Sequence, residues 1–467
     1  MKLPLIFSLA ATVLVGFLSL ADPARAETLS LVGSSEKVCQ LVGETDWQTG
    51  QPTAARTVSN FGLAAVDLGF PVDSGAGPLF FLFGDALPDQ TPLRPVPPDD
   101  AIGVSTRKAA PDSVSCLDLR LIVSAPKVFA HPTVEPPIQQ GAFNVPTGGV
   151  FLDDRFYAFF WTNHCVFPGV LRPDPEAPLT PPPATGVCRQ IPLSNSVGAS
   201  VLAEAAARTP ALFHAWTSTP PFEPLREMPS GFVYVSAAKP PVEIGPLRPE
   251  GPREGIPVFG AARYRASIPY LAVAPRETFA DPRSWAFFAG LSGGKPVWLT
   301  RDQWESGRNL GGGWKPPAGA EMFDAALPGD RCVGEHSVTW NEPLKKWLLV
   351  YNCDPPAGLH ASGAGIQARV ASEPWGPWSA PITLLNAAHD PGALCALIMS
   401  PSGCPGRVSV PSGRGAGFFY APFVIDRFTQ NETPPGPGQP KRTTIYWVVS
   451  TWNPYYVVVM RSTLELK

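Results

Sequence analysis

Residues 332–353 read CVGEHSVTWNEPLKKWLLVYNC and contain the clearest fold signal in the chain. Two runs rich in β-branched and aromatic residues flank turn-forming residues at 341–344. Strand signals on both sides of a turn predict a β-hairpin. Because the turn lies midway between Cys332 and Cys353, the hairpin would place these cysteines opposite each other. A disulfide closing this loop would stabilise the fold by about 3 kcal/mol.

The same pattern recurs along the chain. Hairpin-centred units begin near residues 60, 144, 260, 332 and 417. Further strand signals follow the fourth and fifth units, and residues 28–42 are a candidate outer strand for the last unit. Strong helix formers gather only at 201–208. Five units of three or four strands predict an all-β fold, a five-bladed β-propeller.

The units are unevenly spaced, and the extra length lies in Pro-rich stretches at 87–98, 168–183 and 240–257. We expect these stretches to be loop insertions, because proline cannot donate to a central β-ladder. A pair of β-sandwiches is the alternative architecture, since its strands carry the same signals. A propeller differs because it brings the innermost strands of all units to one axis.

The composition excludes several classes of protein. Aromatic residues make up 10% of the chain and charged residues only 16%, which excludes a mainly disordered chain. The net charge is −3 and no run of Lys and Arg occurs, so we expect no nucleic-acid partner and no anionic membrane surface. Serine-hydrolase, zinc-protease and phosphate-loop motifs are missing, and the six histidines do not cluster. We therefore expect no metal and no cofactor.

The first 26 residues have the pattern of a signal peptide. Lys2 precedes an apolar stretch at 3–20, and residues 24–26 form an A-x-A cleavage signal. An uncleaved membrane anchor is the alternative. We expect a secreted or periplasmic monomer without a membrane span after cleavage, in which residues 27–467 form a single propeller domain.

Eight cysteines fit an oxidising compartment, because an even count is typical of a disulfide framework. No C-x-x-C motif occurs, which gives little support to a zinc or redox site. Besides the hairpin pair, we expect two local pairs, Cys165–Cys188 and Cys395–Cys404. Cys39 and Cys116 then remain to pair with each other.

Three carboxylates interrupt apolar strand signals, where a charge needs a reason. Asp67 lies in LAAVDLGF, Glu335 lies in CVGEHSV, and Asp85 ends a Phe-rich strand. Asp67 and Glu335 fall on candidate axis-lining strands. Glycoside hydrolysis needs two carboxyls, one protonated and one ionised, so Asp67 and Glu335 are the favoured catalytic pair and Asp85 is the third candidate. The alternative is that each carboxylate accepts backbone N–H groups at a blade junction.

Side chains suited to binding sugars are also present, although aromatic residues of this kind are common in protein cores. Flat rings can cover sugar C–H groups, and polar side chains can bond hydroxyls. Strand alternation points Glu335 and His336 to opposite faces, so His336 reaches the axis only if a bulge intervenes. The candidate substrate-binding residues are Asn144, Trp161, Arg263, Tyr264, His336, Arg369, Tyr420 and Trp452.

Several segments, taken in order, resemble the family described as domain of unknown function 4185. They span nearly the whole chain after residue 26, and the ordered set carries the resemblance better than any one motif. The segments are VDLGFP at 66–71, FGD at 83–85, GEHSVTWN at 334–341 with Trp347, WGPWS at 375–379 after Arg369, YAPF at 420–423, YW at 446–447 and STWNPY at 450–455.

Part of that family is classed as glycoside hydrolase family 183, the endo-D-arabinanases. The resemblance implies a five-bladed propeller, export, and endo-hydrolysis of D-arabinofuranose polymers such as those of mycobacterial cell walls. It makes Asp67 the first catalytic candidate, followed by Glu335 and Asp85. Two positions depart from the family pattern, because Val66 and Ala86 stand where threonine is usual.

We therefore expect a secreted glycoside hydrolase whose partner is a furanose-containing polysaccharide, with D-arabinan of the arabinogalactan or lipoarabinomannan type favoured. One alternative is a non-catalytic carbohydrate-binding propeller of the cell envelope. Another is a structural or interaction protein, whose axis would be plugged by apolar side chains. Two carboxyls that face one axial pocket, about 5 to 9.5 Å apart, would distinguish the enzyme from the carbohydrate-binding propeller.

Overall fold

The computed structural model describes most of the chain after residue 26. Every statement about structure below concerns these residues alone. The described ranges are 27–88, 100–129, 139–153, 155–166, 187–188, 200–205, 222–243, 254–262, 265–307, 314–323, 331–353, 365–386, 391–400, 402–406, 416–434, 436 and 438–467.

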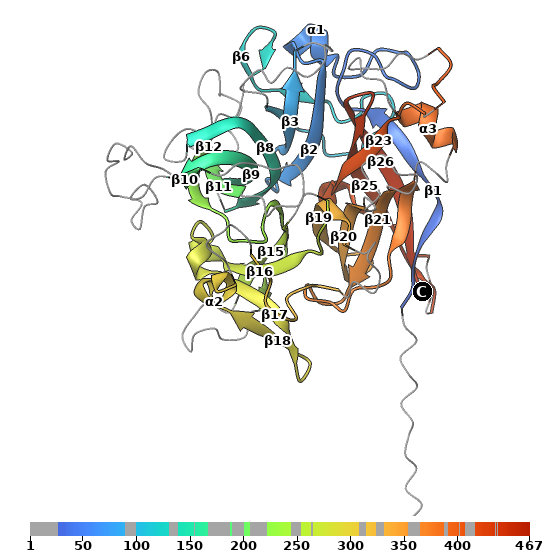
Figure 1. Cartoon of the computed structure of the whole chain (residues 1–467). Coiled ribbons are helices and arrows are strands. Elements are labelled where there is room, and N and C mark those ends of the chain that lie inside the picture. The colour runs from blue at the N-terminus through green and yellow to red at the C-terminus, as the bar shows by residue number, and fades with distance from the viewer. Residues whose placement is uncertain are drawn as a thin grey trace, which may run out of the picture.

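Five antiparallel sheets surround one axis and form a five-bladed β-propeller, as the sequence predicted (Figure 1). The first two blades, from the axis outward, are β2 (Ala65–Asp73), β3 (Leu79–Leu87), β4 (Ala101–Ser105) and β5 (Arg120–Leu121), then β8 (Gln139–Leu152), β9 (Arg155–Val166), β11 (Ser200–Ala205) and β12 (Phe222–Glu227). The strand β10 (Val187–Cys188) also pairs with β9, and β6 (Val123–Ala125) and β7 (Val128–Phe129) form a separate ribbon.

The other three blades follow in chain order. The third is β13 (Tyr234–Ala237), β15 (Glu254–Ala261), β16 (Tyr270–Pro275), β17 (Ala286–Ser292) and β18 (Lys295–Leu299), with β14 (Val242–Glu243) on β15. The fourth is β19 (Val333–Asn341), β20 (Lys346–Cys353), β21 (Gly365–Ala371) and β22 (Ile382–Asn386). The fifth is β23 (Phe418–Val424), β25 (Lys441–Trp452), β26 (Tyr456–Leu466) and β1 (Leu29–Gln40), with β24 (Gln430–Asn431) on β25.

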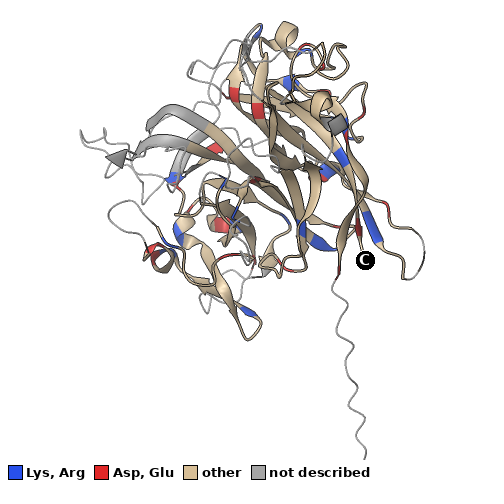
Figure 2. Cartoon of the chain, turned by 45° about the vertical axis from the view of Figure 1, so that its right-hand side comes forward, with Lys and Arg blue, Asp and Glu red and all other residues tan. Residues whose placement is uncertain are grey.

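The described helices are short. The α-helices are α1 (Thr57–Phe61), α2 (Arg301–Glu305) and α3 (Pro391–Leu397), and the 3₁₀ turns are η2 (Arg276–Thr278), η3 (Pro282–Ser284) and η5 (Asp426–Phe428). In the described part of the chain, no helix has the length and hydropathy to cross a membrane. Acidic and basic residues are interspersed over the described ribbons (Figure 2).

The five innermost strands, β2, β8, β13, β19 and β23, pack against one another in a closed ring. Hydroxyl side chains bridge neighbouring blades at this ring. Ser236 Oγ accepts the Val338 backbone N–H at 3.1 Å, and Ser337 Oγ accepts that of Val424 at 3.0 Å. These bonds satisfy backbone groups that the sheets leave unpaired at the axis.

The hydrophobic core lies mainly between adjacent blades. One cluster packs the third blade against the fourth through Phe259, Trp347 and Trp378. A second packs the second blade against the third around Trp304, which is fully buried, and Phe287. Because each blade buries both faces, its strands carry the near-continuous apolar runs that marked the units in the sequence.

The N-terminal strand closes the ring. β1 pairs with β26 as the outermost strand of the fifth blade, which confirms the expected outer strand at 28–42. The disulfide Cys39–Cys116 then joins β1 to the first blade, since Cys116 lies between β4 and β5. The junction between the last and first blades is thus held by strand pairing and a covalent link.

The expected disulfides Cys39–Cys116, Cys332–Cys353 and Cys395–Cys404 are formed. Cys165 and Cys188 occupy directly paired positions on β9 and β10, but their side chains lie outside the described part. The expected signal peptide and the Pro-rich stretch 168–183 also lie outside it.

The helix formers at 201–208 begin in the strand β11, which is hydrogen-bonded on both sides, to β9 and β12. Two local expectations were wrong. The third blade begins at β13 near residue 234, rather than near 260. The last residues of the stretch 240–257 belong to β15, whose Pro257 pairs with Val273. In β11 and at Pro257, strand pairing outweighs local propensity.

Candidate active site

Two cavities lie along the propeller axis, and all five innermost strands line both of them. The N-terminal ends of these strands line one cavity of about 310 Å³, and their C-terminal ends line the other, of about 250 Å³. Asp67, Asp85 and Glu335 all line the first cavity. The sequence placed Asp67 and Glu335 on axis-lining strands, whereas Asp85 ends a second strand and could instead have held a turn. Its aromatic walls are Trp161, Tyr234, Phe418, Tyr420, Trp452 and Tyr455.

Irregular backbone in the first blade places Asp67 beside Asp85. In the pairing of β2 with β3, Asp67 lies opposite Gly84, and the register shifts on both sides of Asp67 and Leu68. Leu68 and Asp85 have positive φ angles of 61° and 46°. Such conformations cost about 1–3 kcal/mol each for non-glycine residues and cluster at functional sites. The bulges therefore mark this strand pair as a candidate site independently of its charges.

Each aspartate accepts a hydrogen bond from a tyrosine of the fifth blade. The hydroxyl of Tyr420, on β23, donates to Asp67 Oδ2 at 3.1 Å. The hydroxyl of Tyr455, between β25 and β26, donates to Asp85 Oδ2 at 3.1 Å. Asp67 Oδ1 is buried and has no hydrogen-bond partner among the described residues. A ligand group in the cavity could supply that partner.

Glu335 is held by an arginine, whereas the two aspartates are held by tyrosines. Arg265 binds both of its oxygens, with Nε donating to Oε2 at 3.0 Å and Nη2 to Oε1 at 2.9 Å. Both side chains are almost fully buried, with exposed fractions of 4% for Arg265 and 5% for Glu335. A bidentate Arg–carboxylate pair is among the strongest charge-assisted contacts and fixes the orientation of both groups. Glu335 therefore contributes a fixed, compensated charge to the cavity wall.

The proton affinities of the two aspartates differ. Burial raises the pKa of Asp67 well above its usual range, and the negative charge of Asp85 raises it further. Burial also raises the pKa of Asp85, to a smaller extent, against the hydrogen bond from Tyr455. Burial raises the pKa values of Tyr420 and Tyr455 too, so both phenols remain donors. Asp67, which is buried while Asp85 is partly exposed, is therefore the carboxyl better placed to stay protonated.

Gly84 leaves room for the Asp67 carboxyl, and its replacement should disturb the site. A Cβ at position 84 would lie 2.8 Å from Asp67 Oδ1 and 2.6 Å from Val145 Cγ1. We expect Gly84→Ala to destabilise the fold by about 1–3 kcal/mol through overpacking. We also expect it to displace the carboxyl, which difference infrared spectroscopy of protonated carboxyls would detect. In the matched variant Gly365→Ala, on β21, contacts are 3.0 Å or longer and the Asp67 signal should not change.

Because Asp67 is buried, the unfolding free energy should fall as the pH rises. Above the unfolded pKa of about 3.9 the unfolded chain releases this proton, whereas the folded protein keeps it until its raised pKa. The contribution of Asp67 to the unfolding free energy therefore falls as pH rises through that window. We expect Asp67→Asn to be more stable than the unmodified protein near pH 7, with the difference shrinking towards pH 4. Thermal unfolding across this range measures it, and a pH-independent difference would contradict the raised pKa.

The structure places only some of the predicted substrate-binding residues at the cavity. Trp161, Tyr420 and Trp452 line it. His336 is buried outside it, with Nδ1 3.0 Å from the Gly334 carbonyl oxygen, and burial lowers the pKa of its imidazole to about 4. Arg369 lies on the third strand of the fourth blade, where Nε donates to the Tyr351 hydroxyl at 3.0 Å.

Three further predicted residues fall outside what the structure describes. Arg263 and Tyr264 lie beyond the described ranges, and so does the side chain of Asn144 on β8. Val66 and Ala86, which depart from the family pattern, are buried and do not line the cavity. Their missing hydroxyls therefore leave the cavity wall unchanged.

Sequence reasoning missed several residues that form the cavity. Arg265 stands two residues after the predicted Arg263, and Tyr455 belongs to the quoted segment STWNPY. Tyr234 lies on the inner strand that was not recognised. Within the described residues, no three His, Cys, Asp or Glu side chains come together to hold a metal ion.

Solved structures similar to this chain include a glycosyl hydrolase and two arabinanases, all with little sequence identity. A glycosyl hydrolase from Bacteroides ovatus is 8% identical, with a TM-score of 0.41 and coverage of 92% of this chain and 94% of that chain. An arabinanase from Bacillus subtilis is 9% identical, with a TM-score of 0.35 and coverage of 85% and 94%. An α-L-arabinanase from Cellvibrio cellulosa is 10% identical, with a TM-score of 0.33 and coverage of 85% and 90%.

No curated protein sequence matches the chain. A family model matches residues 247–461, which include β19 and β23 but not the strands that carry Asp67 and Asp85. That family is described as "Domain of unknown function (DUF4185)", and the match confirms the resemblance seen in the sequence.

Proposed function

We propose that this protein is an exported glycoside hydrolase that cleaves a furanose-containing polysaccharide, with D-arabinan as the favoured substrate. The observation that carries the proposal is the pair Asp67 and Asp85, adjacent carboxyls of unequal proton affinity in one aromatic-walled cavity. Two carboxyls whose environments separate their pKa values are the arrangement that acid- and base-assisted hydrolysis requires.

The roles follow from the contacts of each carboxyl. Asp67 retains its proton and would donate it to the leaving glycosidic oxygen. Asp85 is partly exposed at the cavity, so its carboxylate would attack the anomeric carbon or activate a water molecule. The positive charge that develops on the sugar ring would then meet a carboxylate in a largely buried site.

Asp85 suits the second role better than Glu335, which the sequence favoured. Both oxygens of Glu335 accept hydrogen bonds from Arg265, and this bidentate pairing occupies the lone pairs that a reacting carboxylate would offer to substrate. Asp85 accepts a single hydrogen bond among those described, at Oδ2, and its other oxygen is available to a substrate.

The choice of substrate rests on two supports. Rings of Trp161, Trp452 and Tyr455 around a cavity of about 310 Å³ suit one or two sugar residues. D-arabinan is favoured because the resembled family includes endo-D-arabinanases.

Three disulfides among the described residues support export to an oxidising compartment.

The test is product release by the purified protein from mycobacterial arabinogalactan, plant L-arabinan and a fructan. We expect oligosaccharides from arabinogalactan alone. Because Asp67 must be protonated, kcat/KM should fall as pH rises through its raised pKa, whereas an unperturbed aspartate would lose the proton near pH 4. Binding of a polymer without cleavage at any pH would instead identify a carbohydrate-binding propeller.

A further inference from the structure

The ion pair between Glu335 and Arg265 is the most enclosed charged contact at the cavity. We infer that Glu335 and Arg265 form a positioning unit, which fixes the Tyr420 hydroxyl on Asp67 and does not itself react with substrate. This inference rests on the proposed function, because it gives Glu335 and Arg265 a role in the same cavity. A continuous series of contacts runs from Glu335 through Arg265 and Tyr420 to Asp67.

The fourth blade is built to receive the arginine. Val333 N donates to the Ser267 carbonyl oxygen at 3.0 Å, which ties the turn containing Arg265 to the start of β19. Gly334 leaves the space that the arginine stem occupies, since a Cβ there would lie 2.5 Å from Arg265 Cγ. Arg265 itself has a positive φ of 49°. The chain thus adopts a costly conformation to bring this guanidinium to Glu335.

The guanidinium then packs on the ring that bonds Asp67. Arg265 Cζ lies 4.7 Å from the centroid of the Tyr420 ring and 5.7 Å from that of Phe418. A guanidinium over an aromatic face is attracted to it, most strongly where water is excluded. Tyr420 in turn donates its hydroxyl to Asp67 Oδ2 at 3.1 Å. Moving the arginine therefore moves the phenol that orients the acid.

The charged groups around Asp67 allow the inference to be tested through the titration of Asp67. Asp85 from β3, Glu335 from β19 and the hydroxyls of Tyr420 and Tyr455 all act on the Asp67 proton, and the Arg265 cation packs on the Tyr420 ring. Glu335 favours the protonated form of Asp67, whereas the Arg265 cation opposes it. Removing one partner should therefore shift the titration of Asp67 in one direction, and removing the other should shift it oppositely.

The experiment compares Glu335→Gln, Arg265→Met and the double variant by their pH profiles of kcat/KM on arabinogalactan. We expect the basic limb to move to lower pH in Glu335→Gln and to higher pH in Arg265→Met. In the double variant it should return towards its original position. Each single variant should retain activity, with kcat reduced about 100-fold, the cost of misplacing a catalytic group by about 1 Å. The double variant also guards against misfolding, because it leaves no buried charge unpaired.

Glu321→Gln is the matched control, because Glu321 forms a bidentate pair with Arg331 away from the cavity. Glu321→Gln should change neither the limbs of the pH profile of kcat/KM nor kcat. Loss of all activity in Glu335→Gln, restored by added formate, would overturn the inference and make Glu335 a reacting carboxylate. If the basic limb of the pH profile stayed at the same pH in both single variants, the inference would also be overturned.

A second measurement separates this inference from the proposed function. Difference infrared spectroscopy can titrate the protonated carboxyl of Asp67 without substrate, with the band assigned by its absence in Asp67→Asn. If no polymer is cleaved, the proposed function fails, yet the same opposite shifts of the Asp67 band would still support the positioning unit. Bands that titrate at the same pH in all variants would contradict it.

Discussion

Replacing Asp67 by asparagine is expected to reduce kcat on arabinogalactan by about 10³-fold or more, since general acid catalysis alone contributes about 10²–10⁴-fold. Asparagine has the same shape and still accepts the Tyr420 hydroxyl, but it cannot donate a proton to the leaving oxygen. Because the interaction is made only in the transition state, KM should change much less than kcat. Initial rates of oligosaccharide release measure both constants.

Asp73→Asn is the matched control for this result. Asp73 lies at the other end of the same strand, lines the second axial cavity, and pairs with Arg427. The same chemical change there should leave kcat within about twofold, as expected for a site outside the chemistry. Equal losses in the two variants would show that the strand, rather than the acid, was disturbed. Full activity of Asp67→Asn would exclude Asp67 as the proton donor.

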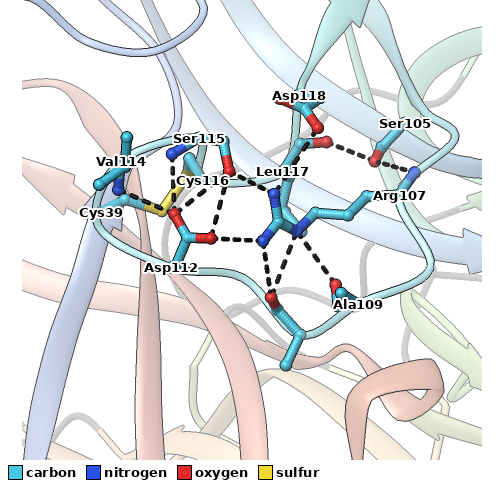
Figure 3. A network of polar contacts seen from close by, with 11 residues as sticks. Cys39, Ser105, Arg107, Ala109, Asp112, Val114, Ser115, Cys116, Leu117 and Asp118 are labelled. Carbon is cyan, nitrogen blue, oxygen red and sulfur yellow. Dashed lines mark hydrogen bonds and ion pairs between the residues drawn. A yellow bond between two sulfur atoms is a disulfide. The ribbon is translucent and has the colours of Figure 1, made fainter.

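Removing the Cys39–Cys116 disulfide is expected to give the largest loss of stability. The disulfide spans 77 residues and joins the two blades between which the ring closes. On the loop-entropy account, its removal should lower the unfolding free energy by about 4 kcal/mol. Around it, Arg107 bonds Asp112, Ser115 and backbone carbonyl oxygens, so the loop is also tied by polar contacts (Figure 3).

The double variant Cys39→Ala with Cys116→Ala tests this expectation by denaturant unfolding under oxidising conditions. Removing the Cys395–Cys404 pair is the comparison, because that disulfide spans only 9 residues and should contribute less. Tyr420 and Tyr455 come from the fifth blade and their aspartates from the first, so loosening this junction should also reduce kcat. Equal effects of the two disulfides would refute the assigned role at the ring closure.

The propeller could be predicted because its hairpins are local. The paired runs around 341–344 have strong strand signals, and each blade repeats them. The outer strand at 28–42 instead pairs with the far end of the chain. The strand at 201–205 could not be predicted, because its alanines favour helix and only pairing with β9 and β12 makes it extended. Likewise, Pro257 argued against the strand that contains it.

The three carboxyls of the candidate site could be predicted from the sequence, but the contacts that distinguish them could not. Asp67, Asp85 and Glu335 stood out because charges rarely interrupt apolar strands. Their different states depend on contacts between segments far apart in sequence, such as Arg265 with Glu335 and Tyr420 with Asp67. The substrate-binding candidate His336 does not line the cavity, although β19 has a register shift between Val333 and His336. No local pattern could show which carboxyl would be paired and which would keep its proton.

The most direct test of a catalytic axial cavity is a crystal structure of the Asp67→Asn variant with a D-arabinan oligosaccharide. The account predicts a glycosidic oxygen within hydrogen-bond distance of the side chain at position 67. It also predicts an anomeric carbon facing Asp85, and sugar rings against Trp161 or Trp452. An oligosaccharide bound elsewhere, with the cavity holding only solvent, would contradict the account.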